Sequence, residues 1–193
     1  MKSSQEELVM HPIRSLVEME SHLASIRQSP SDEGMVEMIV SRPITGGRQV
    51  MDNADLNIAS GLVGDNWVSR KDKHTADGKP DPGRQLTLMN SRAINAITES
   101  AERWPEAGDQ FFVDFDLSDE NLPPGTRLGI GQAVIEVSPL PHLGCFKFGK
   151  RFGKEANQFV NSTVGKTLNL RGINARVITS GVVAPGDPIR KIL

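Results

Sequence analysis

The stretch Thr126–Val137 reads Thr-Arg-Leu-Gly-Ile-Gly-Gln-Ala-Val-Ile-Glu-Val, an apolar run in which glycine recurs at Gly129 and Gly131. Short runs rich in β-branched residues favour strands, and glycine inside such a run is typical of bulges and bends. Two further runs of this kind lie on either side, at 110–117 and 173–183. Together the three runs predict a curled sheet, so the expected fold is a mainly β protein, a small β-barrel with a few flanking helices.

Further strands are expected in the first half of the chain. Met35–Val40 and Gln85–Met89 are short runs of strand-forming residues, and 49–59 alternates polar with apolar residues. The segment 65–84 is different, because it is rich in charge and almost free of apolar residues after Val68. We expect it to be a long exposed loop, which in a compact domain is either functional or plain surface.

A helix is expected before the first strand. Residues 11–28 carry apolar residues at broadly helical spacing, and Pro30 ends the pattern. We therefore expect two parts, a helical extension over 1–30 and a single domain over 31–193.

Two more helices are expected beside the barrel. Asn90 or Ser91 is a suitable N-cap for the first. The second, after residue 145, has an amphipathic pattern with apolar residues at i, i+4, i+8, i+11 and i+12. The apolar positions of the first are Ala93, Ile94, Ile97 and Ala101, and those of the second are Phe148, Phe152, Ala156, Phe159 and Val160.

The composition of the chain limits the classes of function that we expect. The chain has 193 residues with 22 basic and 24 acidic side chains, a formal net charge of −2, which argues against a nucleic-acid-binding protein. Residues 1–7 lack the apolar run of a signal peptide, and no segment has the length of a membrane span. One cysteine excludes an internal disulfide and suits a reducing compartment. We expect a cytoplasmic protein with no nucleic-acid or membrane partner.

The sole cysteine, Cys145, lies in Pro141-His-Leu-Gly-Cys-Phe-Lys-Phe148, a turn that leads into the basic, amphipathic helix. Cations and a helix N-terminus favour the thiolate form, which is the species that attacks, carries sulfur or ligates a metal. A lone cytosolic cysteine is more often a small buried hydrophobe. Its cationic surroundings favour a functional role here.

Polar residues near Cys145 in sequence suggest an anion site with a thiolate. The guanidinium of arginine can bind phosphate with two parallel hydrogen bonds, and lysine contributes a single positive charge. A run of charged residues opposite the apolar side of a helix is, however, often only the solvent-exposed side. His142 is either a proton donor or a cap of the turn. Zinc is not expected, because His142 and Cys145 are the only close pair of zinc-ligating residues. The candidate residues are Cys145, His142, Lys147, Arg151, Asn161, Arg171 and Arg176.

These residues resemble the MOSC family, named for the C-terminal domain of molybdenum cofactor sulfurase. The resemblance covers about residues 35–190 and is specific from 110 onward. One departure is Asn66-Trp67, where many relatives have Arg-His. The matching motifs are Gly61-Leu-Val-Gly-Asp65, Asp119-Glu-Asn-Leu122, Gly131-Gln-Ala-Val-Ile-Glu-Val137, Pro141–Phe148, Arg151-Phe-Gly153 and Arg171-Gly-Ile173.

The resemblance implies a barrel of the MOSC and pyruvate-kinase-barrel type that binds the molybdenum cofactor, a phosphate-bearing pterin. It implies Cys145 as metal ligand, with Cys145 and His142 as catalytic residues, in an oxidoreductase that reduces a small N-oxygenated substrate. Electrons would come from an external donor protein, and a homodimer is one expected assembly. The family is also associated with pyridoxal phosphate binding. The implied cofactor-binding residues are Asn121, Lys147, Arg151, Asn161, Arg171 and Arg176.

Two other functions stay open. Cys145 could carry a persulfide that it receives from a sulfur-donor protein and passes to an acceptor, which requires a reachable thiolate but no redox metal. Alternatively, the chain is a non-catalytic module that binds a pterin or another anion.

Overall fold

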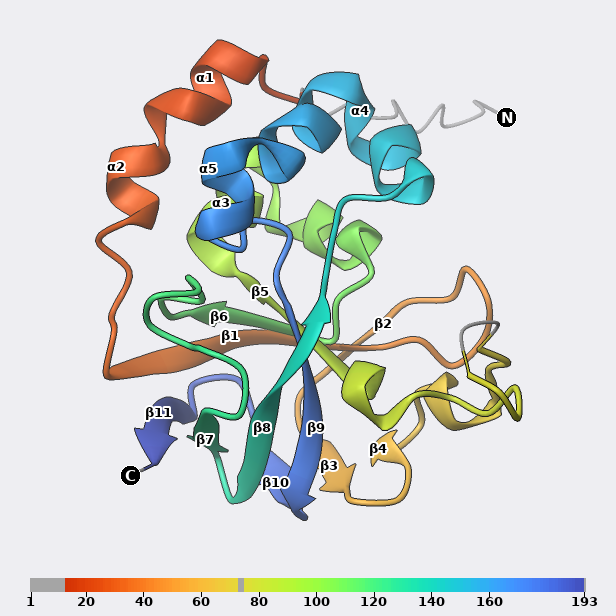
Figure 1. Ribbon diagram of the computed structural model, residues 1–193. Helices are drawn as coiled ribbons and strands as arrows, with labels where there is room; N and C mark the ends of the chain where they lie inside the picture. Colours follow the sequence, from red (N-terminus) through yellow and green to blue (C-terminus); the bar gives the residue numbers. More distant parts are fainter. Residues whose placement is uncertain (1–12, 73–74, 193) are drawn as a thin grey trace, which may run out of the picture.

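The computed structural model describes residues 13–72 and 75–192, and its centre is a closed barrel of seven strands. The strand order is β11-β7-β8-β9-β5-β6-β1, and β1 pairs back onto β11 to close the ring (Figure 1). All neighbours are antiparallel except β5 and β6. The strands are β1 (Glu33–Ser41), β5 (Leu86–Asn90), β6 (Phe111–Asp114), β7 (Arg127–Ile130), β8 (Ala133–Pro141), β9 (Ile173–Thr179) and β11 (Pro188–Ile192). The predicted mainly β barrel is confirmed.

Four further strands lie outside the ring. β2 (Gln49–Met51) pairs with the end of β1, and a separate three-stranded sheet has the order β10-β3-β4. Its members are β3 (Ala54–Asn57), β4 (Gly61–Leu62) and β10 (Gly181–Val183). The alternating segment 49–59 therefore contributes to two different sheets.

The run Thr126–Val137 is a hairpin rather than one strand. Ile130 pairs with Ala133, so Gly131 and Gln132 form the turn between β7 and β8. Gly131 has a φ of +52°, and a Cβ there would lie 2.6 Å from Asp187 Oδ2. Only glycine suits this position, because the turn needs both a positive φ and a close approach.

Two apolar cores lie on opposite sides of the barrel wall. In β6, Phe111 and Val113 point into the barrel core, whereas Phe112 packs into a second cluster with the helices. Successive side chains of a strand point to opposite faces, so β6 contributes to both cores. Figure 1 shows the α-helices gathered on one side of the strands.

The helix after β5 is shorter than predicted. Asn90 caps α3 (Ser91–Ile97) by accepting from the backbone N–H groups of Arg92 and Ala93, as expected. The helix ends at Ile97 because Thr98 has extended backbone angles. Ala101 was expected on its apolar face, and this was wrong: it is exposed and begins η3 (Ala101–Ala107), a 3-10 helix.

The segment before β1 forms two short helices, α1 (Leu16–Ser21) and α2 (Leu23–Ile26), and residues 1–12 lie outside the described part. Ser15 and Glu18 form a capping box that begins α1. Met19 and Ile26 are buried in the helical core, so this segment is integrated with the rest of the structure. The division of the chain at residue 30 stays a prediction.

The amphipathic helix is confirmed as α4 (Phe146–Asn161), and the five predicted apolar residues are its buried ones. Gly153 interrupts it with a φ of +87°, so α4 consists of two helical parts with a kink between them. The short α5 (Thr163–Thr167) follows. In the parts of the chain that the structure describes, no helix has the length and apolar character required to cross a bilayer.

Candidate functional site

A basic pocket of about 330 Å³ surrounds Cys145. Its walls come from the turn between β1 and β2, from the loop that begins at Asp65, from the end of η3 and from the first two turns of α4. Its polar lining side chains are Thr45, Arg48, Asn66, Arg70, Cys145, Lys147 and Arg151. No carboxylate is among the lining residues that the structure describes.

Cys145 is held at the start of α4. It is the N-cap residue of the helix, and its thiol is exposed. The side chain of Asn161, from the other end of the same helix, accepts from Gly144 N at 3.0 Å and donates to Gly144 O at 2.9 Å. These two bonds fix the backbone that immediately precedes Cys145.

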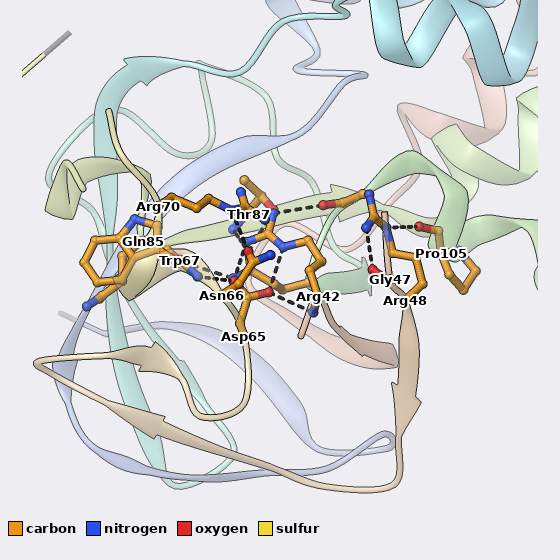
Figure 2. A network of polar contacts seen from close by, with 12 residues as sticks. Arg42, Gly47, Arg48, Asp65, Asn66, Trp67, Arg70, Gln85, Thr87 and Pro105 are labelled. Atoms are coloured by element: carbon orange, nitrogen blue, oxygen red, sulfur yellow. Dashed lines mark hydrogen bonds and ion pairs between the residues drawn. The ribbon is translucent and has the colours of Figure 1, made fainter. Parts of the chain in front are cut away.

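A buried ion pair positions the loop on the opposite wall. Asp65 accepts from the Arg42 guanidinium at 2.7 and 3.0 Å, and its Oδ1 also accepts from Trp67 N at 2.9 Å (Figure 2). Arg42 in turn donates to Gly108 O at 3.0 Å. Asp65 and Trp67 are buried, although 65–84 was expected to be an exposed loop. The beginning of that loop is therefore anchored to the end of β1.

The anchored loop presents Arg70 to the pocket. Arg70 Nε donates to Asn66 Oδ1 at 2.6 Å, and Asn66 lines the same pocket (Figure 2). Burial lowers the pKa of Arg70, and repulsion from Arg42 lowers it further, while Asp65 opposes both. The Arg70 charge is thus only partly balanced within the protein.

Arg48 approaches the pocket from the turn between β1 and β2. It donates to the carbonyls of Pro105 and Gly47 at 3.0 and 2.5 Å (Figure 2). Burial makes the largest contribution to lowering the pKa of Arg48, and repulsion from Arg151 makes the second largest. Arginine side chains that destabilise one another in a pocket without carboxylates create a site for an anion.

The structure brings together some of the predicted site residues. Cys145, Lys147 and Arg151 line the basic pocket. Arg151 NH1 also donates to Glu106 O at 2.5 Å, which fixes its direction. Asn161 holds the backbone of Gly144 through the two hydrogen bonds described above and does not line the pocket.

Arg171 lies behind the pocket wall. It is 5% exposed, donates to Asp109 Oδ2 at 2.6 Å and to Ala107 O at 2.9 Å, and stacks on the Phe148 ring at 4.8 Å. Ala107 and Phe148 both line the basic pocket, so Arg171 supports its wall from behind.

His142 points away from the basic pocket. Its Nδ1 is buried and lies 3.5 Å from Asp109 Oδ1, and the side chain lines a second pocket of about 310 Å³ that Cys145 does not line. Burial, followed by repulsion from Arg171, lowers the pKa of His142 to about 3. The pKa therefore favours the neutral ring near pH 7, and the role of His142 as a catalytic residue stays a prediction.

Asn121 and Arg176 lie elsewhere. Asn121 Nδ2 donates to the carbonyls of Ser31 and Asp116, and its Oδ1 accepts from Lys191. Arg176 is exposed on β9, and its guanidinium donates to Glu136. Neither lines the basic pocket, so their roles in cofactor binding stay predictions.

Sequence reasoning missed Arg48 and undervalued Arg70. Arg48 follows Gly46-Gly47 and directly precedes the predicted segment 49–59, and a glycine-rich turn of this kind was the available signal. Arg70 lies in the charged segment 65–84, for which the sequence predicted only a long exposed loop. Across residues 13–72 and 75–192, no group of three or more His, Cys, Asp or Glu side chains is arranged to hold a metal ion.

Comparisons with known proteins give a family and a fold. A family model described as "MOSC domain" matches residues 71–190. The crystal structure of YuaD from Bacillus subtilis is similar with a TM-score of 0.60 at 18% identity, covering 81% of this chain and 94% of that one. YiiM from Escherichia coli is similar with a TM-score of 0.53 at 20% identity, covering 82% and 70%. A search of curated proteins finds no match.

Proposed function

The chain belongs to the MOSC domain family, and we propose that its basic pocket binds the molybdenum cofactor with Cys145 as the protein ligand of the metal. The cofactor combines a phosphate, which needs cations, with a metal, which needs a soft ligand. The pocket provides groups that suit both the phosphate and the metal.

One observation carries the proposal: an exposed thiol shares a pocket with Arg48 and Arg70, whose charges have no carboxylate beside them in the pocket lining. The planar guanidinium forks suit a phosphate, and a bound anion would relieve the repulsion between them. A thiolate is a soft ligand that suits a metal already held by the pterin sulfurs. The residues present therefore fit the group.

The proposed reaction is the reduction of a small N-oxygenated substrate. When bound, the cofactor would supply two-electron transfer. The N–O bond breaks, two electrons and two protons are consumed, and the oxygen leaves as water. Arg48, Arg70 and Arg151 would orient the cofactor, and Lys147 would line the approach to the thiol. Since the chain has a single cysteine and thus no iron–sulfur ligand set, the electrons come from an external donor protein.

The exposure of Cys145 supports a second candidate. A reachable thiol can accept sulfur from a donor protein as a persulfide and release it to an acceptor thiol or metal. This function needs the thiol but not the arginine cluster. In either case, the single cysteine suits a reducing compartment, and we place the protein in the cytoplasm.

The test is the molybdenum and pterin content of protein made in cells that synthesise the cofactor. We expect near-stoichiometric metal and pterin in the wild type, loss of metal in Cys145→Ala, and loss of both in the double variant Arg48→Ala/Arg70→Ala. Arg176→Ala, which changes an arginine outside the pocket, is the matched control and should keep both.

Other outcomes separate the alternatives. Retention of pterin and metal in Cys145→Ala would indicate a binding module in which the thiol is not a ligand. Absence of both from the wild type, together with a persulfide on Cys145 detected by mass spectrometry, would support the sulfur carrier.

A further inference from the structure

The second pocket, of about 310 Å³, is separate from the basic pocket around Cys145. Its walls come from the loop before β7, the end of β8, the end of α4, α5 and the start of β9 (Figure 1). Among the residues that the structure describes, none lines both pockets. The proposed cofactor site therefore leaves the second pocket unused, and a ligand there would be independent of the cofactor.

The inner lining of the second pocket is apolar. Four of its side chains are at most 5% exposed, and they come from four different parts of the fold. An apolar cavity of about 150 Å³ is large enough to hold benzene. The second pocket is about twice that size, so it has room for a six-membered ring with substituents. The four side chains are Leu122, Val137, Val160 and Ile173.

The charges around the second pocket balance one another. Arg171 lines it but is buried and already pairs with Asp109 Oδ2 at 2.6 Å. Lys166 and Asp119 are exposed and contribute one charge of each sign to the lining. A lining of balanced charge does not attract anions as the basic pocket does, so a neutral ligand suits it.

His142 brings a free ring nitrogen to the second pocket. Its Nδ1 is buried 3.5 Å from Asp109 Oδ1, and within residues 13–72 and 75–192 neither atom has a hydrogen-bond partner. Its Nε2 also has no partner in this described part of the chain, but unlike Nδ1 it is accessible. The imidazole therefore directs one nitrogen at Asp109 and leaves the other free for a ligand in the pocket that it lines.

The carboxylate of Asp109 fixes the tautomer of this ring. Burial is the largest cause that lowers the pKa of His142 to about 3, which favours the neutral ring near pH 7. A neutral imidazole has one N–H and one lone pair. We assign the hydrogen to Nδ1, because a lone pair directed at the carboxylate would be repelled by it. Nε2 then carries the lone pair, so a ligand that reaches it needs an O–H or N–H donor.

We propose that the second pocket binds a small neutral ring compound with a hydroxyl group, a phenol, whose O–H donates to His142 Nε2. The apolar inner lining would cover the ring of the ligand, and the buried Asp109 would hold the imidazole in the required orientation. A carboxylate ligand has no hydrogen to donate at neutral pH. An ammonium ligand has one, but its charge would lie near Lys166 and Arg171.

The experiment titrates three probes of the same shape into the isotope-labelled full chain and follows the backbone amides by NMR. The probes are p-cresol, its methyl ether, which keeps the oxygen but lacks the O–H, and p-toluate, which carries a carboxylate instead. The amides of Gly165 and Gly172 report on the second pocket, and those of Arg48 and Arg70 report on the basic pocket. The titrations therefore give both the affinity and the place of binding.

We expect p-cresol to shift the amides of the second pocket and to bind about fivefold or more tightly than its methyl ether, because only p-cresol donates to Nε2. His142→Phe keeps a ring of similar shape but removes Nε2, so it should bind both probes equally. His22→Phe makes the same exchange between α1 and α2, outside the pocket lining, and should keep the preference of the wild type. If His142→Phe does not fold, the comparison of the three probes on the wild type still decides.

Several results would overturn the inference. Equal affinity of the wild type for p-cresol and its methyl ether, or a preference that survives in His142→Phe, would show that Nε2 accepts no hydrogen bond from the ligand. Tighter binding of p-toluate would make the second pocket an anion site. No binding of p-cresol up to its solubility, or shifts confined to the amides of Arg48 and Arg70, would show that the second pocket does not hold a phenol.

Discussion

The side chain of Asn161 brackets the backbone of Gly144, accepting from its N–H and donating to its C=O one residue before Cys145. Loss of this clamp leaves two backbone groups without their partners. We expect Asn161→Ala to lower the free energy of unfolding by about 1–3 kcal/mol and to reduce cofactor content in the same preparations. Urea unfolding measures the first effect and elemental analysis the second. Asn157→Ala removes only a 3.2 Å contact to Asn161 and should have a smaller effect on both.

Gly144→Ala should break the same clamp from the other side. A Cβ at position 144 would lie 2.7 Å from Asn161 Nδ2 and 2.5 Å from Asn157 Oδ1, so these amides must move. Because both variants disrupt one interaction, we expect the free-energy losses of Gly144→Ala and Asn161→Ala to be non-additive in a double-mutant cycle. Full additivity would show that Gly144 and Asn161 act independently.

His142 should make stability depend on pH. Its folded pKa of about 3 lies below the ordinary value of 6.5, so between these values the unfolded chain binds a proton that the folded chain does not. Stability is therefore complete above pH 6.5 and is lost as the pH falls toward 3. This effect should cost about 2 kcal/mol between pH 8 and pH 5, as measured by urea unfolding at each pH. His142→Gln should lose less free energy of unfolding between pH 8 and pH 5 than the wild type. An identical loss in both proteins would show that His142 does not cause the pH dependence.

The buried pair of Arg42 and Asp65 should be far more important for stability than an exposed pair. Asp65→Ala leaves a buried guanidinium without its counter-charge, and we expect a loss of about 3–5 kcal/mol. Asp77→Ala breaks an exposed pair with Lys79 and should leave the midpoint of denaturant unfolding unchanged. Similar midpoints for the two variants would show that the Asp65 anchor is dispensable.

Met19 tests whether the first helices belong to the core. Its side chain is fully buried between helices, so Met19→Ala should destabilise the protein by about 2–5 kcal/mol. Val17 is 76% exposed on the same helix, and Val17→Ala should change the melting temperature little. Equal, small shifts in both variants would support an independent helical extension instead.

Local patterns account for the parts of the fold that the sequence predicted. The stripe Phe148, Phe152, Phe159 depends on helical periodicity alone, and it was predicted correctly. The hairpin turn at Gly131 was not, because 126–137 reads as one strand-like run in which the glycines suit bulges. Where such a run reverses depends on its neighbours, here the approach of Asp187 to Gly131.

In the candidate site, too, residues that are close in sequence could be predicted and residues brought in by tertiary contacts could not. Cys145, Lys147 and Arg151 lie within one short segment, so a sequence pattern could group them. Arg48 and Arg70 reach the same pocket only through tertiary contacts, and spacing gives no sign of this. The partner of Arg171, Asp109, is 62 residues away in the chain, so sequence alone could not show that this guanidinium is already paired.

The closure of the barrel by β1 and β11 has a consequence for how the protein folds. Glu33 pairs with Arg190 and Met35 with Pro188, so the ring is completed by strands that are among the most distant along the chain. Contacts of such high sequence separation are formed slowly, because a long loop must be closed before they contribute any stability. Until β11 is in place, β1 has an unpaired backbone along that stretch. During synthesis, this edge of β1 is therefore open to pairing with another copy of the chain.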